Sequence, residues 1–351
     1  MRLNAPTASS TLRAWCRPLA LMAVAALAAC GSTPPASTTA VPAAAPAQAA
    51  APSRATPAIK VGIALGGGAA KGFAHIGVIK MLEANGFAPA VVAGTSAGSV
   101  VGALYASGMS AFELQEKAVA LDEARIRDLQ LSTGGLVLGQ KLEDYVNEQV
   151  HHQPLERLAK PFVAVATRLE DGERTVFARG NTGQAVRASS SVPGVFQPVT
   201  IGKYHFVDGG VVSPVPVDAA RQLGADVVVA VDISNKARGQ TPAGMLGTLS
   251  QSIAIMGQKL GQAELARADV IVRPQVLDIG AVDFTQRASA ILEGEKAALA
   301  VMPQIRERVA QLQAARDQAV RLAQHQACLD QRSRLRKWAG LAGLDGACPA
   351  P

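Results

Sequence analysis

From residue 58 onward, short apolar runs alternate with longer stretches in which apolar residues recur every three or four positions. Residues 59–65 form a short, mainly apolar run with three β-branched residues, typical of a buried strand, and Phe73, Ile76 and Ile79 repeat at helical spacing. The same patterns predict further strands at 88–93, 161–168, 174–177, 204–207 and 226–232, and helices at 97–107, 111–121, 139–150 and 215–223. Such alternation predicts an α/β fold with a mostly parallel sheet covered by helices on both faces.

The C-terminal part of the chain has a different pattern. From residue 284 onward the sequence turns helical, and Ile305, Val309 and Leu312 keep the spacing of a helix face. Pro303 is expected to bend or divide this stretch, because proline has no amide hydrogen for the helix. We therefore expect an α/β domain over 58–280 and a helical extension over 281–351.

The beginning of the chain reads as a targeting signal. A basic start precedes an apolar run at 18–29, and these twelve residues are too few to span a bilayer. The run ends in Leu-Ala-Ala-Cys at Cys30, which resembles the signal of bacterial lipoproteins. That resemblance implies a signal peptide over 1–29, lipidation of Cys30 and a lipid-anchored place in the bacterial cell envelope. Because Gly31 is not aspartate, it also implies the outer membrane, facing the periplasm. A plain secretory signal is the alternative.

Residues 30–57 are rich in Ala, Pro, Ser and Thr and carry almost no bulky apolar side chain, so we expect a disordered tether. Export also bears on the four cysteines. Cys16 would leave with the signal and Cys30 would carry the lipid, which leaves Cys328 and Cys348. These two are expected to form a disulfide that pins the C-terminal tail, although two free thiols would fit the same sequence.

Charge and composition exclude some classes of function. The 351 residues carry a formal net charge of +7, but the excess lies at the two ends. Four arginines fall within the first 57 residues, and residues 301–351 hold eight Lys/Arg against four Asp/Glu, which leaves about −1 for 58–300. Aromatic residues are only 4% of the chain. Neither a phosphate-binding face nor a stacking platform for nucleic acid is indicated.

Three consecutive glycines follow the first predicted strand, within Gly-Gly-Gly-Ala-Ala-Lys-Gly at 66–72. The segment fails the Walker pattern, which requires Gly-Lys-Ser/Thr, and it fails the three-glycine dinucleotide fingerprint, so no nucleotide cofactor is expected. Two interpretations remain. The glycines can be a turn between strand and helix without a ligand. Alternatively, their amides can approach a small anion at a helix N-terminus, as in an oxyanion hole.

Ser96 lies between Gly94 and Gly98, where the second predicted strand gives way to a helix. Gly-x-Ser-x-Gly at such a junction is the pattern of a nucleophile elbow, in which the glycines relieve crowding around a serine in a strained bend. A tight turn that happens to contain serine is the alternative. The glycine cluster one strand earlier favours the nucleophile, because parallel pairing would place the two loops side by side.

A serine nucleophile needs a base. Histidine is the usual one, but of five histidines only His325 lies late enough for the hydrolase order, within a polar helix, and His205 is the serious rival. Asp208 ends a short predicted strand and is followed by two glycines. A partly desolvated carboxylate can itself act as base. An ordinary Asx turn at Asp-Gly would explain the same residues.

A fourth segment, Ala-Ser-Ser-Ser-Val-Pro-Gly-Val-Phe-Gln-Pro-Val at 188–199, completes a set of four blocks. In this order and spacing the blocks resemble the patatin-like phospholipase family, the serine lipid acyl hydrolases with a Ser–Asp dyad. The resemblance covers about residues 59–275. It implies a three-layer sandwich with a mostly parallel sheet, and it implies no metal, no cofactor and no catalytic histidine.

Carried over to this sequence, the resemblance implies that Ser96 is the nucleophile and Asp208 its base. The backbone amides of Gly67, Gly68 and Ala69 would form the oxyanion hole. Ala69 is a departure, since many members of the family have glycine there. An alanine amide can still donate a hydrogen bond. The departure therefore leaves open which amides form the oxyanion hole, but it does not change the expected chemistry.

The expected function is therefore that of an exported, membrane-tethered serine hydrolase of the phospholipase A or carboxylesterase type, acting in lipid metabolism or degradation. Its expected partner is a membrane phospholipid or another acyl ester, and no nucleic acid. The same chemistry on short esters or thioesters is one alternative. A non-catalytic lipoprotein that binds lipid or a partner is the other. Residues 122–140, irregular and glycine-bearing, are expected to form a cap over the site.

Overall fold

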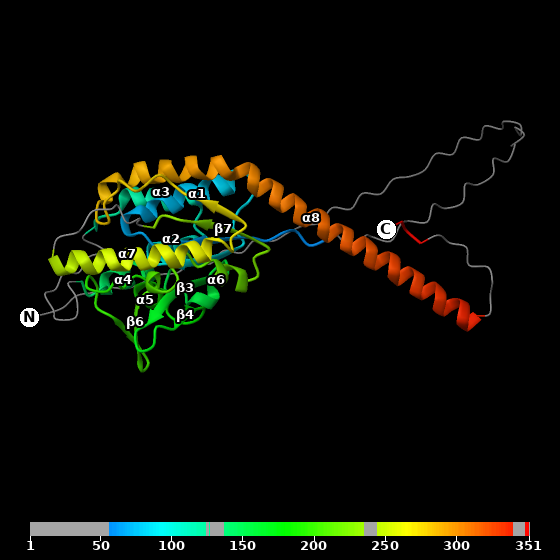
Figure 1. Cartoon of the computed structure of the whole chain (residues 1–351), viewed down its shortest axis with the longest axis horizontal. Coiled ribbons are helices and arrows are strands. Elements are labelled where there is room, and N and C mark those ends of the chain that lie inside the picture. The colour runs from blue at the N-terminus through cyan, green and yellow to red at the C-terminus, as the bar shows by residue number, and fades with distance from the viewer. Residues whose placement is uncertain (1–55, 124–125, 127–136, 235–243, 340–347, 351) are drawn as a thin grey trace, which may run out of the picture. The chain divides into compact units, whose positions relative to one another are not determined.

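The computed structural model describes residues 56–123, 126, 137–234, 244–339 and 348–350. Within them lies one eight-stranded sheet with the order β5-β6-β3-β2-β1-β7-β8, in which β4 pairs with β3 (Figure 1). The expected signal peptide, Cys30, nearly all of the tether and most of the expected cap at 122–140 lie outside the described residues.

The strands keep close to the expected places. They are β1 (Val61–Leu65), β2 (Val91–Thr95), β3 (Phe162–Arg168), β4 (Arg174–Phe177), β5 (Val199–Ile201), β6 (Tyr204–Asp208), β7 (Val227–Val231) and β8 (Val270–Val272). The strand expected at 88–93 begins three residues later and runs on to Thr95, directly up to Ser96. The three-residue strands β5 and β8 were not expected, because such short runs give no usable period.

The middle of the sheet is parallel and one end is antiparallel. β1 lies parallel between β2 and β7, and the parallel pairing extends to β3 on one side and β8 on the other. β4, β5 and β6 add antiparallel pairs beyond β3. The expected mostly parallel sheet is confirmed. Because Leu65 pairs with Gly94, the carboxyl ends of β1 and β2 leave the sheet side by side.

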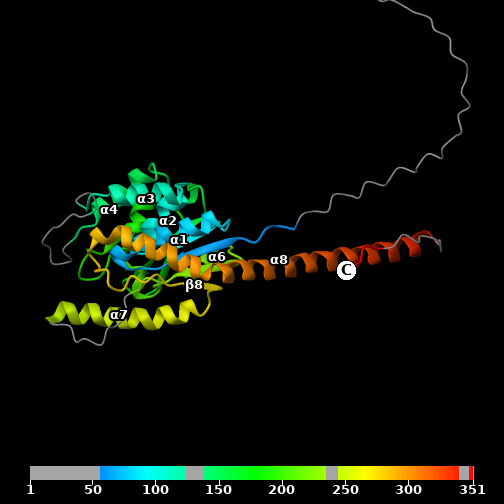
Figure 2. The same cartoon turned by 90° about the horizontal axis from the view of Figure 1, so that it is seen from above.

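Helices cover both faces of the sheet, as the alternating pattern predicts. They are α1 (Phe73–Ala84), α2 (Ala97–Ala106), α3 (Ala111–Ala120), α4 (Gln140–Gln149), α5 (Thr182–Ser189), α6 (Val217–Gln222), α7 (Gly244–Leu265) and α8 (Arg287–Ala339). The apolar core on one face unites α1, α2, α3, α4, α5 and α8 with the sheet, and the core on the other face is formed with α6 and the end of α7 (Figure 2). The result is a three-layer α/β sandwich.

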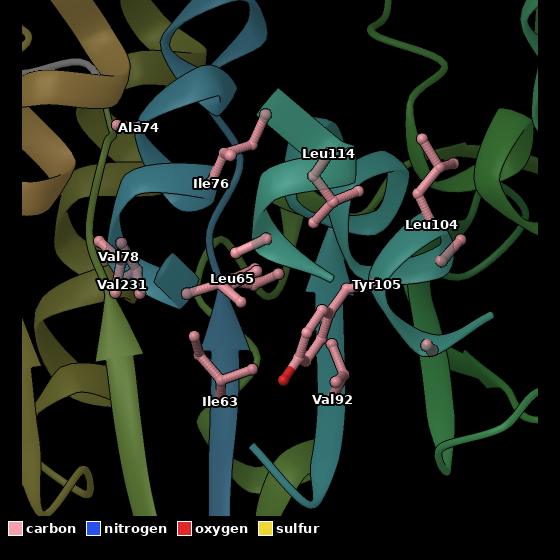
Figure 3. Packing of buried hydrophobic residues seen from close by; sticks show 14 of the residues in the cluster. Ile63, Leu65, Ala74, Ile76, Val78, Val92, Leu104, Tyr105, Leu114 and Val231 are labelled. Atoms are coloured by element: carbon pink, nitrogen blue, oxygen red, sulfur yellow. The ribbon is translucent and has the colours of Figure 1, made fainter. Parts of the chain in front are cut away.

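Alternation along the central strands divides the two cores. Ile63 and Leu65 of β1 belong to the larger one, whereas Ala64 between them belongs to the smaller one. Figure 3 shows Ile63 and Leu65 beside Val92 of β2, with Tyr105 of α2 packed against them. Each such side chain stabilises the fold by roughly 1.5–3 kcal/mol through burial. The two faces together fix the register of the strands that carry the loops described below.

Helix α8 is longer than any other described element. It is continuous over 53 residues and passes through Pro303, so of the two expectations for this proline, a bend or a division, the division is wrong. Its first part packs tightly on α1: a Cβ added to Gly77 would lie 2.0 Å from the Ile291 carbonyl oxygen, and one added to Gly294 would lie 2.0 Å from that of Ala74. Only glycine permits this approach of the two backbones.

Further along α8, Cys328 forms a disulfide with Cys348, which confirms the expected pairing in the C-terminal extension. Among the described residues, no helix is both long and apolar enough to cross a membrane.

Candidate active site

Ser96 occupies a strained bend between β2 and α2. Its φ of 53° and ψ of −125° lie outside the regions that ordinary residues adopt. The flanking glycines are required by close contacts: a Cβ on Gly94 would lie 2.4 Å from the Gly98 carbonyl oxygen, and one on Gly98 would lie 2.1 Å from that of Leu65. The elbow expected from Gly-x-Ser-x-Gly is therefore present, and it holds Ser96 above the start of α2.

The backbone of this bend is fixed from a neighbouring element. The Ser189 hydroxyl accepts a hydrogen bond from the Ser96 amide at 2.9 Å and donates one to the Val165 carbonyl oxygen at 2.6 Å. Ser189 is fully buried at the end of α5. Motif analysis assigned no role to Ser189 itself, although it lies in the Ala-Ser-Ser-Ser segment that contributed to the family resemblance. It ties the elbow to β3.

Asp208 ends β6, two strands away from Ser96, and reaches it across the edge of β3. The register pairs Asp208 with Ala166 of β3. The residue is 6% exposed, its carboxylate receives a hydrogen bond from the Gly210 amide at 2.7 Å, and the Ser96 side chain lies close enough to lower its pKa. The structure thus brings together the hydroxyl and the carboxylate that are 112 residues apart in the sequence.

Burial changes the acid strength of this carboxylate. Desolvation raises the pKa of Asp208 from its ordinary 3.8 to about 6, while the hydrogen bonds from Ser96 and from the Gly210 amide oppose the rise. At pH 7 the group is still largely ionised, yet it binds a proton much more readily than an exposed aspartate. A carboxylate with a pKa near the working pH is well suited to accept a proton from a hydroxyl and return it.

The glycine loop lies directly against Ser96. A Cβ on Gly67 would come within 3.2 Å of the Ser96 Cβ, so this glycine leaves room beside the hydroxyl. Its amide, however, donates to the Pro214 carbonyl oxygen at 3.0 Å. Gly67 therefore differs from the expected donor of an oxyanion hole, because its N–H is already bonded.

Gly68 and Ala69 remain as the expected donors. Neither amide has a hydrogen-bond acceptor among the described parts of the chain. Gly68 lies so close to Ile233 that an added Cβ would meet that side chain at 2.7 Å. Ala69 has a φ of 53°, in the left-handed region that costs an L-residue about 1 kcal/mol. The departure from glycine at this position is thus accommodated with some strain, and its N–H stays available.

Three histidines considered as alternative bases or helix residues lie away from Ser96. His75 is fully buried in α1, its Nε2 bonds the Gly66 carbonyl oxygen at 2.8 Å, and burial lowers its pKa to about 4. His205, the rival base, bonds Glu170 through Nδ1 at 2.8 Å on an exposed part of β6. His325 bonds the Pro349 carbonyl oxygen at 2.7 Å near the end of α8. None of the three contacts Ser96 among the described interactions, so Asp208 is the group in position to accept its proton.

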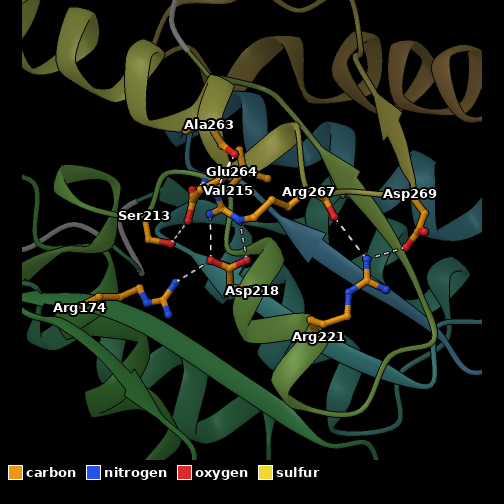
Figure 4. Close-up of polar contacts among 9 residues, drawn as sticks. All are labelled: Arg174, Ser213, Val215, Asp218, Arg221, Ala263, Glu264, Arg267 and Asp269. Carbon is orange, nitrogen blue, oxygen red and sulfur yellow. Dashed lines mark hydrogen bonds and ion pairs between the residues drawn. The ribbon is translucent and has the colours of Figure 1, made fainter.

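A buried acid that the sequence did not single out supports the site from α7. Glu264 accepts hydrogen bonds from the Ser213 hydroxyl at 2.5 Å and from the Val215 amide at 2.8 Å (Figure 4). Burial raises its pKa above the ordinary value. The Ser213 carbonyl oxygen in turn accepts from the Thr95 hydroxyl at 2.9 Å. The segment 213–215 therefore joins α7 to the residue that precedes Ser96.

Ion pairs beside this segment fix α6 to the elements around it. Arg267 contacts both carboxylate oxygens of Asp218, at 2.7 and 2.8 Å, and Arg174 approaches the same carboxylate at 3.5 Å (Figure 4). The arginines lower the pKa of Asp218. Such partly exposed pairs add little stability each, about 1 kcal/mol or less, but they set the position of α6 against the end of α7.

Comparison with known proteins places this geometry in a family. A family model for patatin-like phospholipases matches residues 63–221, a range that contains both Ser96 and Asp208. An uncharacterized NTE family protein of Mycobacterium tuberculosis is 34% identical over 196 residues, which are 55% of this chain and 54% of that protein. The human patatin-like phospholipase domain-containing protein 6 is 31% identical over 184 residues, 50% of this chain and 13% of that protein.

A looser likeness links the fold to the crystal structure of VipD from Legionella pneumophila, with a TM-score of 0.49 and 14% identity over 70% of this chain and 67% of that one. The chain spans about half the length of the mycobacterial relative and a smaller share of the human one. The family match over the elbow, the glycine loop and the acid is the informative finding. Residues 63–221 form a patatin-like phospholipase domain.

Proposed function

We propose that the protein is a serine acyl hydrolase in which Ser96 is the nucleophile and Asp208 the general base, acting on lipid acyl esters. The observation that carries the proposal is that the Ser96 side chain interacts with the buried Asp208 carboxylate, whose pKa burial raises to about 6. The adjoining Gly68 and Ala69 amides supply donors for an oxyanion, and the family supplies the substrate class.

In the acylation step, Asp208 takes the proton of the Ser96 hydroxyl while the serine oxygen bonds to the ester carbonyl carbon. The carbonyl oxygen becomes an oxyanion and accepts hydrogen bonds from the Gly68 and Ala69 amides. Preorganised donors of this kind contribute roughly 3–4 kcal/mol each to the transition state. When the intermediate collapses, the bond to the alcohol breaks and the alcohol oxygen takes the proton from Asp208. An acyl-serine remains.

In the deacylation step, a water molecule gives a proton to Asp208 and its oxygen bonds to the acyl carbon. The same amides hold the second oxyanion. Collapse breaks the acyl bond to Ser96, and the proton on Asp208 returns to the serine oxygen. The carboxylic acid leaves, and the hydroxyl and the carboxylate regain their initial states. Throughout both steps the strained bend keeps the Ser96 side chain directed towards Asp208 and the acyl carbon.

Lipid substrates fit the N-terminal signal. We propose that Cys30 is lipidated after removal of residues 1–29 and that the chain is held at the periplasmic face of the outer membrane, with 30–57 as a tether. Support comes from the Leu-Ala-Ala-Cys sequence and from Gly31. The test is metabolic labelling with a palmitate analogue: label on the wild-type chain and none on Cys30→Ser is expected. Equal labelling of both would contradict the anchor.

The hydrolase proposal is tested with purified full-length chain on a phospholipid panel, a short soluble ester and a thioester. Ser96→Ala and Asp208→Asn are each expected to lower kcat at least about 10³-fold. Ser107→Ala is the matched control, because Ser107 lies at the far end of α2 and its hydroxyl bonds the Leu104 carbonyl oxygen.

The panel also separates the alternatives. Hydrolysis of the short ester or the thioester but of no phospholipid would assign the same chemistry to another acyl substrate. Lipid binding by a wild-type chain that hydrolyses nothing would assign a non-catalytic role. Retention of wild-type hydrolysis by Ser96→Ala would show that the activity comes from other residues.

A further inference from the structure

Helix α7 turns its small residues towards the domain and large apolar ones away from it. Gly257 faces the Gly210 carbonyl oxygen, which a Cβ would approach to 3.7 Å, and Gly261 faces Pro214 at 3.4 Å. Ile255, Met256 and Leu260 are 46%, 55% and 38% exposed. A surface helix ordinarily buries its apolar side chains and presents polar ones to water. Over these residues α7 does the reverse.

The exposed side of this segment, which we call the α7 stripe (Ile255, Met256 and Leu260), carries no acid. The sequence of α7 contains two charged residues, Lys259 and Glu264. Glu264 is buried against the 213–215 segment, whereas Lys259 is exposed beside the stripe. An apolar surface with a neighbouring cation fits a lipid interface, where apolar side chains enter the acyl region and lysine meets anionic headgroups.

Helix α7, whose outer side carries the α7 stripe, lies next to the active site. The helix contacts the turn η4 (Gly209–Val211), which directly follows Asp208. In Figure 2 α7 lies along one edge of the domain, and in Figure 1, turned by 90°, it crosses the middle of the domain. The hydrogen bonds of Glu264 with Ser213 and Val215 fix the helix to the segment 213–215, and the Pro214 carbonyl oxygen within that segment accepts from the Gly67 amide. The helix is thus connected to both loops of the site.

We propose that the α7 stripe docks onto the surface of a lipid bilayer and holds the Ser96 site against it. The role of the docking rests on the proposed hydrolase function, whereas the binding of α7 to a bilayer does not depend on hydrolysis. The helix lies in the interface rather than crossing it, since no described helix can span a membrane. A second protein copy is a poorer occupant, because a stable dimer needs roughly 20–30 residues a side and the stripe offers three large side chains.

The test uses the chain that begins at residue 30, with Cys30→Ser, so that neither an acyl anchor nor the apolar run at 18–29 contributes to binding. Ile255, Met256 and Leu260 are changed together to Glu, and in a milder variant together to Ser. The control is Phe112→Glu with Val119→Glu on α3, where the two side chains are 63% and 61% exposed. Each protein is sedimented with phosphatidylcholine vesicles with and without phosphatidylglycerol, and is assayed on vesicle lipid and on a short soluble ester.

Both α7 variants are expected to lose vesicle binding, by about tenfold or more, because each removed apolar contact is worth roughly tenfold in partitioning. Hydrolysis of vesicle lipid should fall in parallel, while hydrolysis of the soluble ester and vesicle binding by the α3 control stay at the parent level. Lys259→Glu should weaken binding only to the vesicles that contain phosphatidylglycerol.

Three results would overturn the docking proposal. The first is unchanged vesicle binding by both α7 variants. The second is an equal loss in the α3 control. The third is a dimer in the parent that becomes a monomer in the variants without loss of vesicle binding, which would make the stripe an interface between copies. If the parent hydrolyses no ester at all, the proposed function fails, but vesicle sedimentation still decides whether the stripe binds lipid.

Discussion

Asp208→Asn should make the protein more stable while it abolishes hydrolysis. The Asp208 carboxylate is buried and its pKa is raised from 3.8 to about 6, so the folded state bears the cost of burying a charge at neutral pH. Asparagine has nearly the same shape without the charge. Its oxygen can still accept from the Gly210 amide, which donates to Asp208 at 2.7 Å. Its amide hydrogen can face the Ser96 oxygen, so neither group loses its partner.

The magnitude follows from the two pKa values. Their separation, from 3.8 to about 6, corresponds to on the order of 3 kcal/mol at roughly 1.4 kcal/mol per pKa unit. Between these values the folded state binds more protons than the unfolded state, so the contribution of Asp208 to stability falls as pH rises through this window. Below pH 3.8 the cost is absent, and above pH 6 it is fully present. The gain from asparagine should therefore be near zero at pH 3.5 and reach up to about 3 kcal/mol at pH 8.

The assay is urea unfolding of the full-length chain followed by far-UV circular dichroism at several pH values. The quantity of interest is the difference in unfolding free energy between Asp208→Asn and wild type. The contribution of His75 to stability changes with pH in the opposite direction. Burial lowers the pKa of His75 to about 4, so its contribution rises with pH between about 4 and 6.5. Since both proteins retain His75, its effect cancels in the difference.

A difference that does not change with pH would refute this reasoning, because it would show that Asp208 does not carry a raised pKa. A less stable variant at pH 8 would refute it as well. The second result would mean that the hydrogen bonds of the carboxylate outweigh its desolvation, and the account of Asp208 as a desolvated, proton-accepting group would fail.

Three further predictions concern the rate, the elbow and the extension. The kcat/KM for a soluble ester should rise as pH increases through about 6, because only ionised Asp208 accepts a proton, and a flat profile from pH 5 to 8 would contradict this. Gly98→Ala should lower the unfolding free energy, measured by thermal unfolding, by about 3 kcal/mol or more, because the added Cβ would lie 2.1 Å from a carbonyl oxygen. The control Gly261→Ala should be neutral or stabilising by up to about 1 kcal/mol, because its added Cβ would lie 3.4 Å from its nearest neighbour. Reducing the Cys328–Cys348 bond should leave ester hydrolysis unchanged within about twofold and affect proteolysis only of the chain end, because the bond lies far along α8 from the sheet; loss of activity on reduction would contradict this separation.

Strong periodic signals in the sequence predicted the central sheet and the elbow. Continuous apolar runs identified β1, β2 and β7, and the glycines around Ser96 indicated a bend whose close contacts the structure shows. These features depend on neighbours in the sequence, so a local pattern is enough to reveal them. The pairing of Ser96 with Asp208, in contrast, was inferred from a family resemblance, since no local pattern relates residues so far apart.

Three features needed the structure. The Gly67 amide is bonded to Pro214, a contact across 147 residues that no motif reveals. Glu264 looks like any acid on a helix in the sequence, and only the fold shows that it is buried against Ser213. Pro303 was expected to bend or divide the C-terminal stretch, and only the structure shows that the helix continues through it. Long-range contacts of this kind are set by the assembled sheet rather than by the local chain.

The most direct test of the dyad is covalent labelling of wild type, Asp208→Asn and Ser107→Ala with a fluorophosphonate, followed by peptide mass spectrometry and by the rate of labelling against pH. Adduct on Ser96 in wild type and in Ser107→Ala, with a rate that rises through pH 6 and falls at least about 100-fold in Asp208→Asn, is the predicted result. An unlabelled Ser96, or equal labelling with and without the Asp208 carboxylate, would show that this carboxylate does not activate the serine.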